Sequence, residues 1–404
     1  MLVRSVEFSQ GELIVEVRPR WRRPRCGRCS RKAPGYDQRR IRRWRSLNFG
    51  ATRVWLEYAP RRVECKRCGV VTEEVPWARL SSHFTRDFEE MTAYLAQTTD
   101  KTTVSRLMGI AWATVGKIVG RVVAERLDPG RLKGLCRIGV DDFSYRKRHR
   151  YLTLVLDHDS KCVVWAAKGR SAETLKKFFE ELTDGEREKI ECVTIDMAAG
   201  YIKAIKEALP NAQIIFDRFH VQRLASDALD EVRREQLRKL RGTSKGRELL
   251  RSRFPLLKNP WNLTHADDEK LSVIQRTNAP LYRGYLLKEG LALALDYKQP
   301  ARARRSLEEW LAWASRSRLE PFVRLARTIR KHFEGIIAYV KYRLTNGVVE
   351  GTNNRLRVIA RMAFGFHSPE PLIAMLFLCC GGITLYPPLP GLSLNSILNH
   401  PLVI

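Results

Sequence analysis

Two pairs of cysteines near the start of the chain constrain its folding more than any other feature. Cys26 and Cys29 form one C-x-x-C pair, Cys65 and Cys68 form the second, and 35 residues lie between the pairs. Both pairs lie in basic turns that contain a glycine, whereas the cysteines of a hydrophobic core usually lie in apolar runs. Four thiolates in this pattern predict a closed, tetrahedral site for one structural Zn²⁺. We expect the long gap between the pairs to hold a basic loop and a hairpin.

The apolar segments and the first residues indicate a reducing compartment and no membrane partner. No signal peptide opens the chain, so we expect a cytoplasmic protein, in which paired cysteines favour a metal over a disulfide. The longest apolar stretch, residues 372–385, is short for a membrane span and is interrupted by Gly381 and Gly382. We therefore interpret it as a buried helix.

The charge of the chain indicates a polyanionic partner. Its 404 residues carry a formal net charge of +29, and residues 1–70 hold 19 Lys and Arg against six Asp and Glu. Such a charge opposes a compact state unless a polyanion neutralises it, so we expect DNA as the partner and association with the nucleoid. A basic or ribosome-associated protein is the alternative. The arginine fork suits phosphates and guanine edges, and the densest run supplies the candidate DNA-binding residues Arg39, Arg40, Arg42, Arg43 and Arg45.

A helix-turn-helix is predicted between Thr102 and Val119. Thr102 or Thr103 is placed to cap the first helix, and Gly109 is placed to make the turn. Apolar spacing in the second helix predicts which side chains point outward to a DNA major groove. A plain helical hairpin fits this segment equally well, and the neighbouring basic zinc region favours the DNA-binding interpretation. The outward residues are Trp112, Thr114, Lys117 and Arg121.

Alternating and helical patterns from residue 137 to residue 217 predict one α/β domain. Strands are expected at residues 137–143, 151–157, 162–167, 192–195 and 213–216, and helices after Ser171 and at residues 199–208. The first three strands follow one another closely, which predicts an antiparallel meander. The resulting order, β-β-β-α-β-α-β, is that of the RNase H-like fold.

Carboxylates occur where this order needs them for metal-dependent phosphoryl transfer. Asp141 and Asp196 end two of the predicted strands, and Glu350 lies near the start of a helix that Asn346 is placed to cap. Hard oxygen ligands suit two Mg²⁺ or Mn²⁺ ions, which activate a water or 3′-hydroxyl and stabilise the leaving oxygen. Each acid alone is ordinary, since a strand-ending Asp is usually a turn former. Asn354 and Arg357, further along the same helix, are candidate DNA-phosphate contacts.

The chain resembles the transposases of the ISL-three insertion-sequence family along most of its length. The resemblance is carried by the two C-x-x-C pairs and by residues 138–146 (IGVDDFSYR), 194–197 (TIDM), 216–221 (FDRFHV), 346–354 (NGVVEGTNN) and 363–366 (AFGF). It implies an RNase H-like core, a DDE triad of Asp141, Asp196 and Glu350, and movement of a mobile DNA element through its terminal inverted repeats. Where the family pattern has Asp-Glu, this chain has Asp141-Asp142; strand alternation puts Asp142 on the opposite face, so Asp141 is assigned to the triad.

Asp217 and His220 form a possible auxiliary pair just after the fifth strand. His220 is suited to orienting the scissile phosphate or the attacking water, and a structural Asp–His pair is equally compatible with the sequence.

Between Asp196 and Glu350 the chain is mostly helical and charged, which predicts a helical insertion into the core. Within it, Trp261 is a candidate for stacking on an unpaired base, whereas the spacing of Trp310 and Trp313 favours core packing.

These features predict a multidomain α/β protein. The predicted parts are a zinc-binding, DNA-binding β region (1–80), a helix-turn-helix (81–130), an RNase H-like core in two parts (131–222 and 341–404, the second with the catalytic Glu helix and the C-terminal helix), and an all-helical insertion between them (223–340). The predicted function is a DNA transposase that cuts and joins the ends of an insertion sequence, as a homodimer or larger complex on DNA. The alternatives are a non-enzymatic zinc and helix-turn-helix regulator, and an RNase H-like nuclease.

Overall fold

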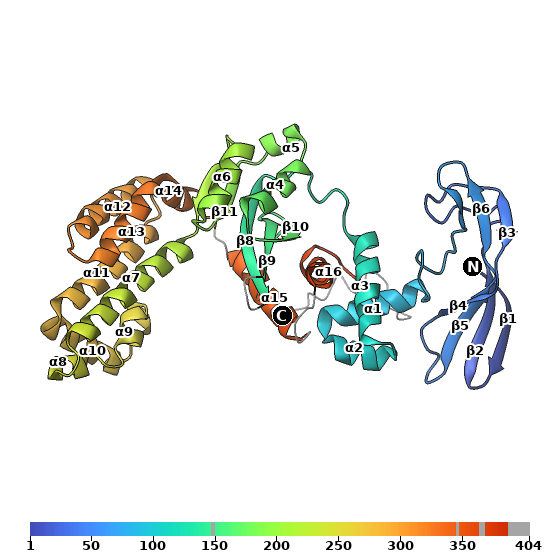
Figure 1. Cartoon of the computed structure of the whole chain (residues 1–404), viewed down its shortest axis with the longest axis horizontal. Coiled ribbons are helices and arrows are strands. Elements are labelled where there is room, and N and C mark those ends of the chain that lie inside the picture. The colour runs from blue at the N-terminus through green and yellow to red at the C-terminus, as the bar shows by residue number, and fades with distance from the viewer. Residues whose placement is uncertain (147–149, 345–346, 363–367, 387–404) are drawn as a thin grey trace. The chain divides into compact units, whose positions relative to one another are not determined.

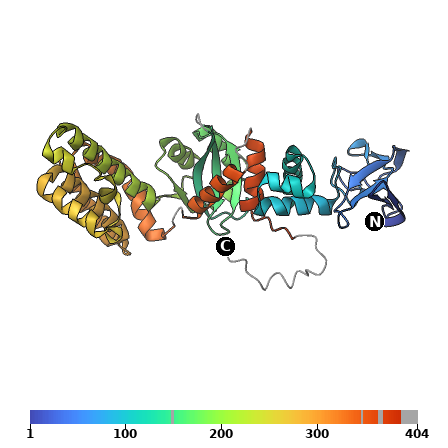
Figure 2. The same cartoon turned by 90° about the horizontal axis from the view of Figure 1, so that it is seen from below.

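The computed structural model describes residues 1–146, 150–344, 347–362 and 368–386. The chain divides into two compact units. One consists of Met1–Asp128 together with the chain from Leu356 onward, and the other is Pro129–Arg355. Figures 1 and 2 show the elements of each unit from two directions.

The first unit begins with a four-stranded sheet in the order β1-β2-β5-β4. Its strands are β1 (Leu2–Ser9), β2 (Glu12–Arg18), β4 (Arg42–Arg45) and β5 (Arg53–Tyr58). The sheet packs its inner face around the buried side chains of Val17, Trp44, Leu56, Trp77 and Ala78. The basic run was expected to be a loop, but its second half is strand β4, paired antiparallel with β5. Trp44 packs into the core of this sheet, and its burial holds this part of the run as a strand.

A three-stranded sheet in the order β3-β6-β7 carries the cysteines. Its strands are β3 (Gly35–Gln38), β6 (Arg61–Cys65) and β7 (Gly69–Thr72). Gly27 lies so close to the end of β7 that a Cβ there would be 2.6 Å from the carbonyl oxygen of Thr72. A side chain at this position would push the first cysteine turn away from the strand.

Helices α1 (Arg86–Thr98), α2 (Lys101–Met108) and α3 (Trp112–Arg126) follow. The predicted turn is confirmed, because Gly109 ends α2 in the left-handed conformation with φ of 57°. The predicted cap is wrong: Asp100 caps α2 by accepting from the backbone N–H groups of Thr102 and Thr103. A carboxylate one residue before the helix reaches these N–H groups, whereas the two threonines already lie within the first turn.

The predicted C-terminal helix is α16 (Pro369–Cys380), and its apolar side chains are buried as expected. It packs against α3 and α1, and Gln97 of α1 donates to the carbonyl oxygens of Leu378 and Ile383. The sequence instead assigned this helix to the second part of the catalytic core. Apolar residues around most of its surface permit burial against any neighbour, so the sequence pattern did not identify the partner.

No single helix in the described part of the chain has the length and apolar character needed to cross a membrane. The bent pair α2 and α3, at 98° to each other, satisfies the criteria of length and composition only.

The second unit is built on a five-stranded sheet in the order β10-β9-β8-β11-β12. The strands are β8 (Arg137–Arg146), β9 (Arg150–Asp157), β10 (Val163–Lys168), β11 (Cys192–Ile195) and β12 (Gln213–Phe216). β8, β9 and β10 form the predicted antiparallel meander, and β11 runs parallel to both β8 and β12. Helices α4 (Ala172–Glu180), α5 (Asp184–Glu188) and α6 (Ala199–Ala208) connect the later strands (Figure 1).

A long helical segment follows β12 and continues to Tyr342. It contains α7 (Arg218–Lys239), α8 (Ser244–Glu248), α9 (Arg253–Leu257), the short 3₁₀ turn η1 (Pro260–Asn262), α10 (His265–Thr277), α11 (Ala279–Asp296), α12 (Pro300–Ser315), α13 (Glu320–Lys331) and α14 (Phe333–Tyr342). α14 returns to the sheet and packs against β12. The next element is α15 (Gly347–Met362), which carries the third predicted acid.

Candidate catalytic carboxylates and DNA-binding surfaces

The four predicted zinc ligands come together in the first unit. The sulfur atoms of Cys26, Cys29, Cys65 and Cys68 all lie within 4.8 Å of one another. Backbone N–H groups of Arg67 and Cys68 lower the pKa of the Cys65 thiol to about 7, which favours the thiolate that a metal requires. Four sulfur ligands fit a closed structural Zn²⁺ site with no position for a water.

Asp141 and Asp142 lie on opposite faces of β8, as strand alternation predicts. Asp142 is paired in the sheet with Thr153, whose hydroxyl is 2.7 Å from the Tyr201 hydroxyl of α6. Asp141 instead accepts a 2.7 Å hydrogen bond from Asn353 of α15. Asp141 therefore shares a face with the helix of the third predicted acid, and Asp142 shares a face with α6.

The electrostatics around β8 show that several acidic groups have gathered. Burial, together with the carboxylates of Asp142 and Asp196, raises the pKa of Asp141 to about 6. Burial also raises the pKa of Asp142, which forms an ion pair with Arg170. Buried carboxylates that repel one another favour either a proton or a bound cation.

Asp196 follows β11, the strand next to β8. One of its carboxylate oxygens accepts from the backbone N–H of Ala198, 3.0 Å away, which fixes the start of the turn into α6. β11 runs parallel to β8 with Thr194 beside Gly139, so Asp196, two residues further on, is level with Asp141 in the middle of β8, which continues to Arg146. The structure thus brings together two of the three predicted acids.

His220 lies near the same carboxylates. Its positive charge lowers the pKa of both Asp141 and Asp142. Asp217 is buried and caps α7 by accepting from the backbone N–H of Phe219 at 3.4 Å. Asp217 thus contributes a cap at the strand-to-helix junction, and His220 is half-buried in the first turn of α7.

Glu350 belongs to the described backbone of α15, but its side chain lies outside the described residues, as do the predicted cap Asn346 and the AFGF motif at 363–366. Asn353, one turn after Glu350, is 7% exposed and donates to Asp141. The side-chain oxygen of Asn353 is buried and has no hydrogen-bond partner among the residues that the structure describes. Sequence reasoning missed Asn353 because its partner is 212 residues away, and it missed Arg170 because that residue lies in a loop without a motif.

Some arginines of the basic run are exposed, and others contact groups within the protein. Arg39 and Arg40 are exposed and line a cleft of about 630 Å³. Arg43 is exposed and pairs with Glu57, whereas Arg42 donates to the carbonyl oxygen of Ser82. The prediction that Arg45 faces DNA is not supported by its position. Its guanidinium is buried against Phe88 and donates to the carbonyl oxygen of Gly109 at 2.7 Å, and so links β4 to the helix-turn-helix.

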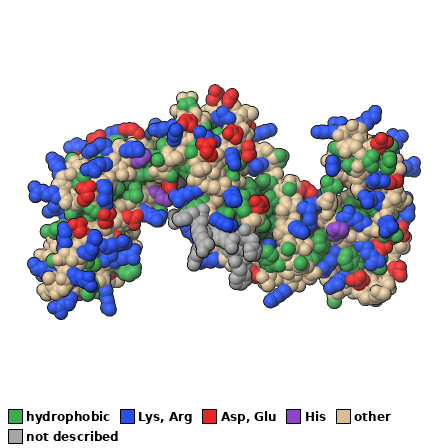
Figure 3. Space-filling view, in the orientation of Figure 1, with side chains coloured by type: hydrophobic (Ala, Val, Ile, Leu, Met, Phe, Trp, Pro, Cys, Tyr) green, Lys and Arg blue, Asp and Glu red, His purple; other side chains and the backbone are tan. Residues whose placement is uncertain are grey.

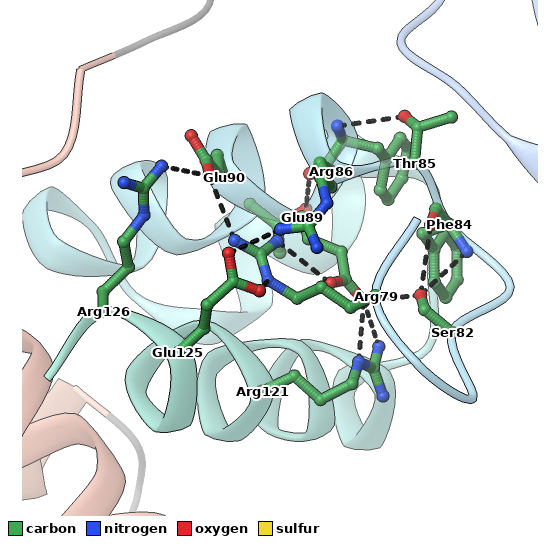
Figure 4. Close-up of polar contacts among 12 residues, drawn as sticks. Arg79, Ser82, Phe84, Thr85, Arg86, Glu89, Glu90, Arg121, Glu125 and Arg126 are labelled. Carbon is green, nitrogen blue, oxygen red and sulfur yellow. Dashed lines mark hydrogen bonds and ion pairs between the residues drawn. The ribbon is translucent and has the colours of Figure 1, made fainter. Parts of the chain in front are cut away.

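The outward face of α3 differs from the prediction at one position. Trp112 and Lys117 are exposed and Thr114 is half-buried, whereas Arg121 is half-buried and binds Glu89. The side chain of Glu89 is fully buried, and it also pairs with Arg79 (Figure 4). A buried carboxylate needs cationic partners, which explains why Arg121 turns inward. Further ion pairs in Figure 4 join α1, α3 and the preceding loop through Arg86, Glu90, Glu125 and Arg126.

The remaining candidate residues differ in how exposed their side chains are. Asn354 and Arg357 are exposed on α15. Trp310 is a core residue, since its ring N–H donates to the carbonyl oxygen of Leu287. Trp313 is 39% exposed and packs near Gly290, and Trp261 is 72% exposed.

Comparison with known proteins gives three family matches. Residues 22–68 match the zinc finger of transposases IS204/IS1001/IS1096/IS1165, residues 73–123 match the helix-turn-helix domain of transposase family ISL3, and residues 138–376 match a transposase model. The chain is 39% identical over 433 residues to the transposase for insertion sequence element IS1557 of Mycobacterium tuberculosis, covering 99% of this chain and 95% of that protein. It is 30% identical over 370 residues to the transposase for insertion sequence element IS1001 of Bordetella parapertussis, covering 89% of each chain.

Proposed function

Because the chain belongs to the ISL3 transposase family, whose members catalyse DNA cleavage and strand transfer, we propose that it binds the terminal inverted repeats of an insertion sequence, cuts the DNA there and joins the ends to target DNA. The zinc ribbon and the helix-turn-helix domain bind DNA in this proposal, and the transposase domain carries the chemistry. No finding favours the regulator or the nuclease.

The strand order supports an RNase H-like catalytic core. Three antiparallel strands followed by two parallel strands, with β8 in the centre, have the expected topology. In this proposal, the core comprises residues 131–222 and the α15 part of residues 341–404, and the segment 223–340 is an insertion. Residues 1–80 and 81–130 are the DNA-binding domains, and α16 packs against α1 and α3 of the second.

The catalytic residues proposed are Asp141, Asp196 and Glu350. Support comes from the gathering of half-buried carboxylates on the neighbouring strands β8 and β11 and from the contact of Asp141 with the helix of Glu350. Hard oxygens in a half-buried site suit Mg²⁺ or Mn²⁺, and a two-ion site activates the attacking oxygen and stabilises the leaving oxygen. Asn353 orients Asp141, and its unpaired oxygen is available to a water bound at the site.

His220 is proposed as an auxiliary residue. It lies in the first turn of α7, on the side of the core where its charge acts on both Asp141 and Asp142, and an imidazole there is suited to a phosphate oxygen of the scissile strand. The Asp142–Arg170 ion pair keeps Asp142 on the α6 face, which supports the assignment of Asp141 as the metal ligand.

DNA contacts are proposed for the exposed candidates. In the ribbon these are Arg39, Arg40 and Arg43; in the helix-turn-helix they are Trp112, Thr114 and Lys117; on α15 they are Asn354 and Arg357. Arg42, Arg45 and Arg121 serve mainly to hold the DNA-binding unit together. Because two element ends have to be held at once, the active form is a homodimer or larger complex on DNA.

The meeting of Asp141, Asp196 and the α15 helix is the observation that carries this proposal, and a strand-transfer assay tests it. Wild type and the variants Asp141→Asn, Asp196→Asn and Glu350→Gln are compared on a duplex with the element's terminal repeat and Mg²⁺. Asp184→Asn, an acid whose side chain is 92% exposed, is the matched control. Each catalytic variant should bind the duplex and lose cleavage, while the control should cut. Normal cleavage by the variants would rule out the assignment.

A further inference from the structure

The tip of the helical segment, residues 238–258, has an unusual charge. We call it the α8–α9 tip. Between Gln236 and Ala266 the chain has eight Lys and Arg and one acid, Glu248. Five of these cations are exposed and have no ion-pair partner among the described residues. They are Arg238, Arg241, Lys245, Arg247 and Arg251.

Several cations elsewhere in the same helical segment are paired with acids, so the tip is distinctive for its density of like charge. Arg304 pairs with Glu334, and Arg324 pairs with Glu231, as expected for an ordinary solvated surface. Figure 3 shows Lys and Arg side chains gathered at the α8 end of the segment. Unpaired, like-charged side chains repel one another, and a polyanion removes that repulsion. The exposed apolar side chains Leu250, Phe254 and Trp261 lie among these cations or just after them, a combination found where proteins grip a DNA groove.

One continuous helix links this tip to the catalytic carboxylates. α7 starts beside them with His220 in its first turn and ends with Lys239 at the tip (Figure 1). At about 1.5 Å per residue, the 19 steps from His220 to Lys239 span roughly 29 Å. B-DNA advances about 3.4 Å per base pair along each strand, so this helix is as long as roughly eight to nine base pairs.

We propose that the α8–α9 tip binds the backbone of the same DNA duplex that is cut, about one helical turn from the scissile phosphate. The proposal rests on the assignment of the catalytic carboxylates above. A duplex is stiff over about 150 base pairs, so DNA that occupies both places has to run alongside α7. Arg223, Arg234 and Arg238 are spaced by 11 and 4 residues, so they lie on one face of α7. Asp227 and Asp230 lie on the same face. Asp230 is paired with Arg233 and Arg234.

A pair of matched double variants tests the proposal by binding to duplexes of two lengths. The tip variant is Arg241→Gln with Arg247→Gln. The control is Lys298→Gln with Arg302→Gln, two exposed cations that also lack an ion-pair partner among the described residues. The probes carry the element's terminal repeat and flank, and extend either about 15 or about 5 base pairs to each side of the cleaved phosphate. Binding is measured without Mg²⁺ at several salt concentrations, and cleavage of the long probe is measured separately.

On the long probe, the tip variant should lose affinity and the logarithmic salt slope should fall by about 1.8, because about 0.9 is lost per phosphate contact. The control should match wild type, and tip variant and wild type should bind the short probe equally. Hydroxyl-radical protection about eight to ten base pairs from the cut should disappear only in the tip variant. Equal binding of the long probe by tip variant and wild type, or an equal loss on both probes, would overturn the proposal. Wild type that binds but does not cut would instead count against the catalytic assignment.

Discussion

Replacing Asn353 by alanine tests whether its contact with Asp141 serves the reaction or only the fold. The hydrogen bond is 2.7 Å long, and its acceptor is a buried carboxylate. A hydrogen bond to a charged group contributes about 1.5–3 kcal/mol to stability. The same substitution removes the buried side-chain oxygen of Asn353, which has no partner among the described residues and costs about 1–3 kcal/mol to bury. The two effects oppose each other, so the free energy of unfolding should change by no more than about 2 kcal/mol.

The effect on the metal site should be much larger. Groups that orient a metal ligand typically change metal affinity or activity by about 10- to 100-fold when removed. We therefore expect Asn353→Ala to cut terminal-repeat DNA about 10- to 100-fold more slowly and to need more Mg²⁺ for half-maximal rate. Calorimetric titration with Mn²⁺ should show the same loss of affinity in the absence of DNA.

The matched control is Val358→Ala, a 52% exposed position on the same helix, which should change neither quantity. A large loss of stability with unchanged Mn²⁺ affinity would show that Asn353 acts only in packing. Wild-type cleavage and wild-type Mn²⁺ affinity in Asn353→Ala would refute the orienting role altogether.

Four further predictions concern residues 1–128, which hold the zinc ribbon and the helix-turn-helix domain. Glu89→Ala should lower the free energy of unfolding by about 1.5–3 kcal/mol in urea denaturation, because Arg79 and Arg121 lose a buried charged partner while Arg79 keeps Glu90 and Glu125; a change below about 1 kcal/mol would contradict this. Burial lowers the pKa of Lys101 to about 8, so the unfolded chain holds more protons above that pH; stability should rise from pH 8 towards 10.5, and Lys101→Met should abolish that rise. Cys65→Ser should release the zinc, measured as metal per chain, and weaken DNA binding; full zinc content would refute the four-cysteine site. Arg39→Gln should reduce the salt slope of DNA binding by about 0.9, whereas Arg45→Gln should mainly lower the melting temperature; the reverse pattern would show that the two arginines have been misassigned.

The sequence by itself determined the local elements and their order. The two C-x-x-C pairs predicted the four-cysteine cluster, because a short turn holds the two cysteines of each pair together. Only the path of the chain between the pairs was left open. Strand alternation predicted β8 to β12 and the opposite faces of Asp141 and Asp142, since a strand period is a property of adjacent residues. Gly109 predicted its own turn because few other residues adopt a left-handed conformation without strain.

Only the tertiary structure decided which polar side chains bind partners within the protein. Arg45 and Arg121 have the same local signature as the exposed arginines of the basic run, yet both meet partners from distant segments. Asn353 and Asp141 are likewise far apart in the chain, and α16 joins α1 and α3 rather than the domain that precedes it. Periodicity reports which face of an element is buried, but it carries no information about which other element covers that face. Those pairings are set by the packing of whole elements, because a buried charge or amide is stable only where the fold supplies its partner.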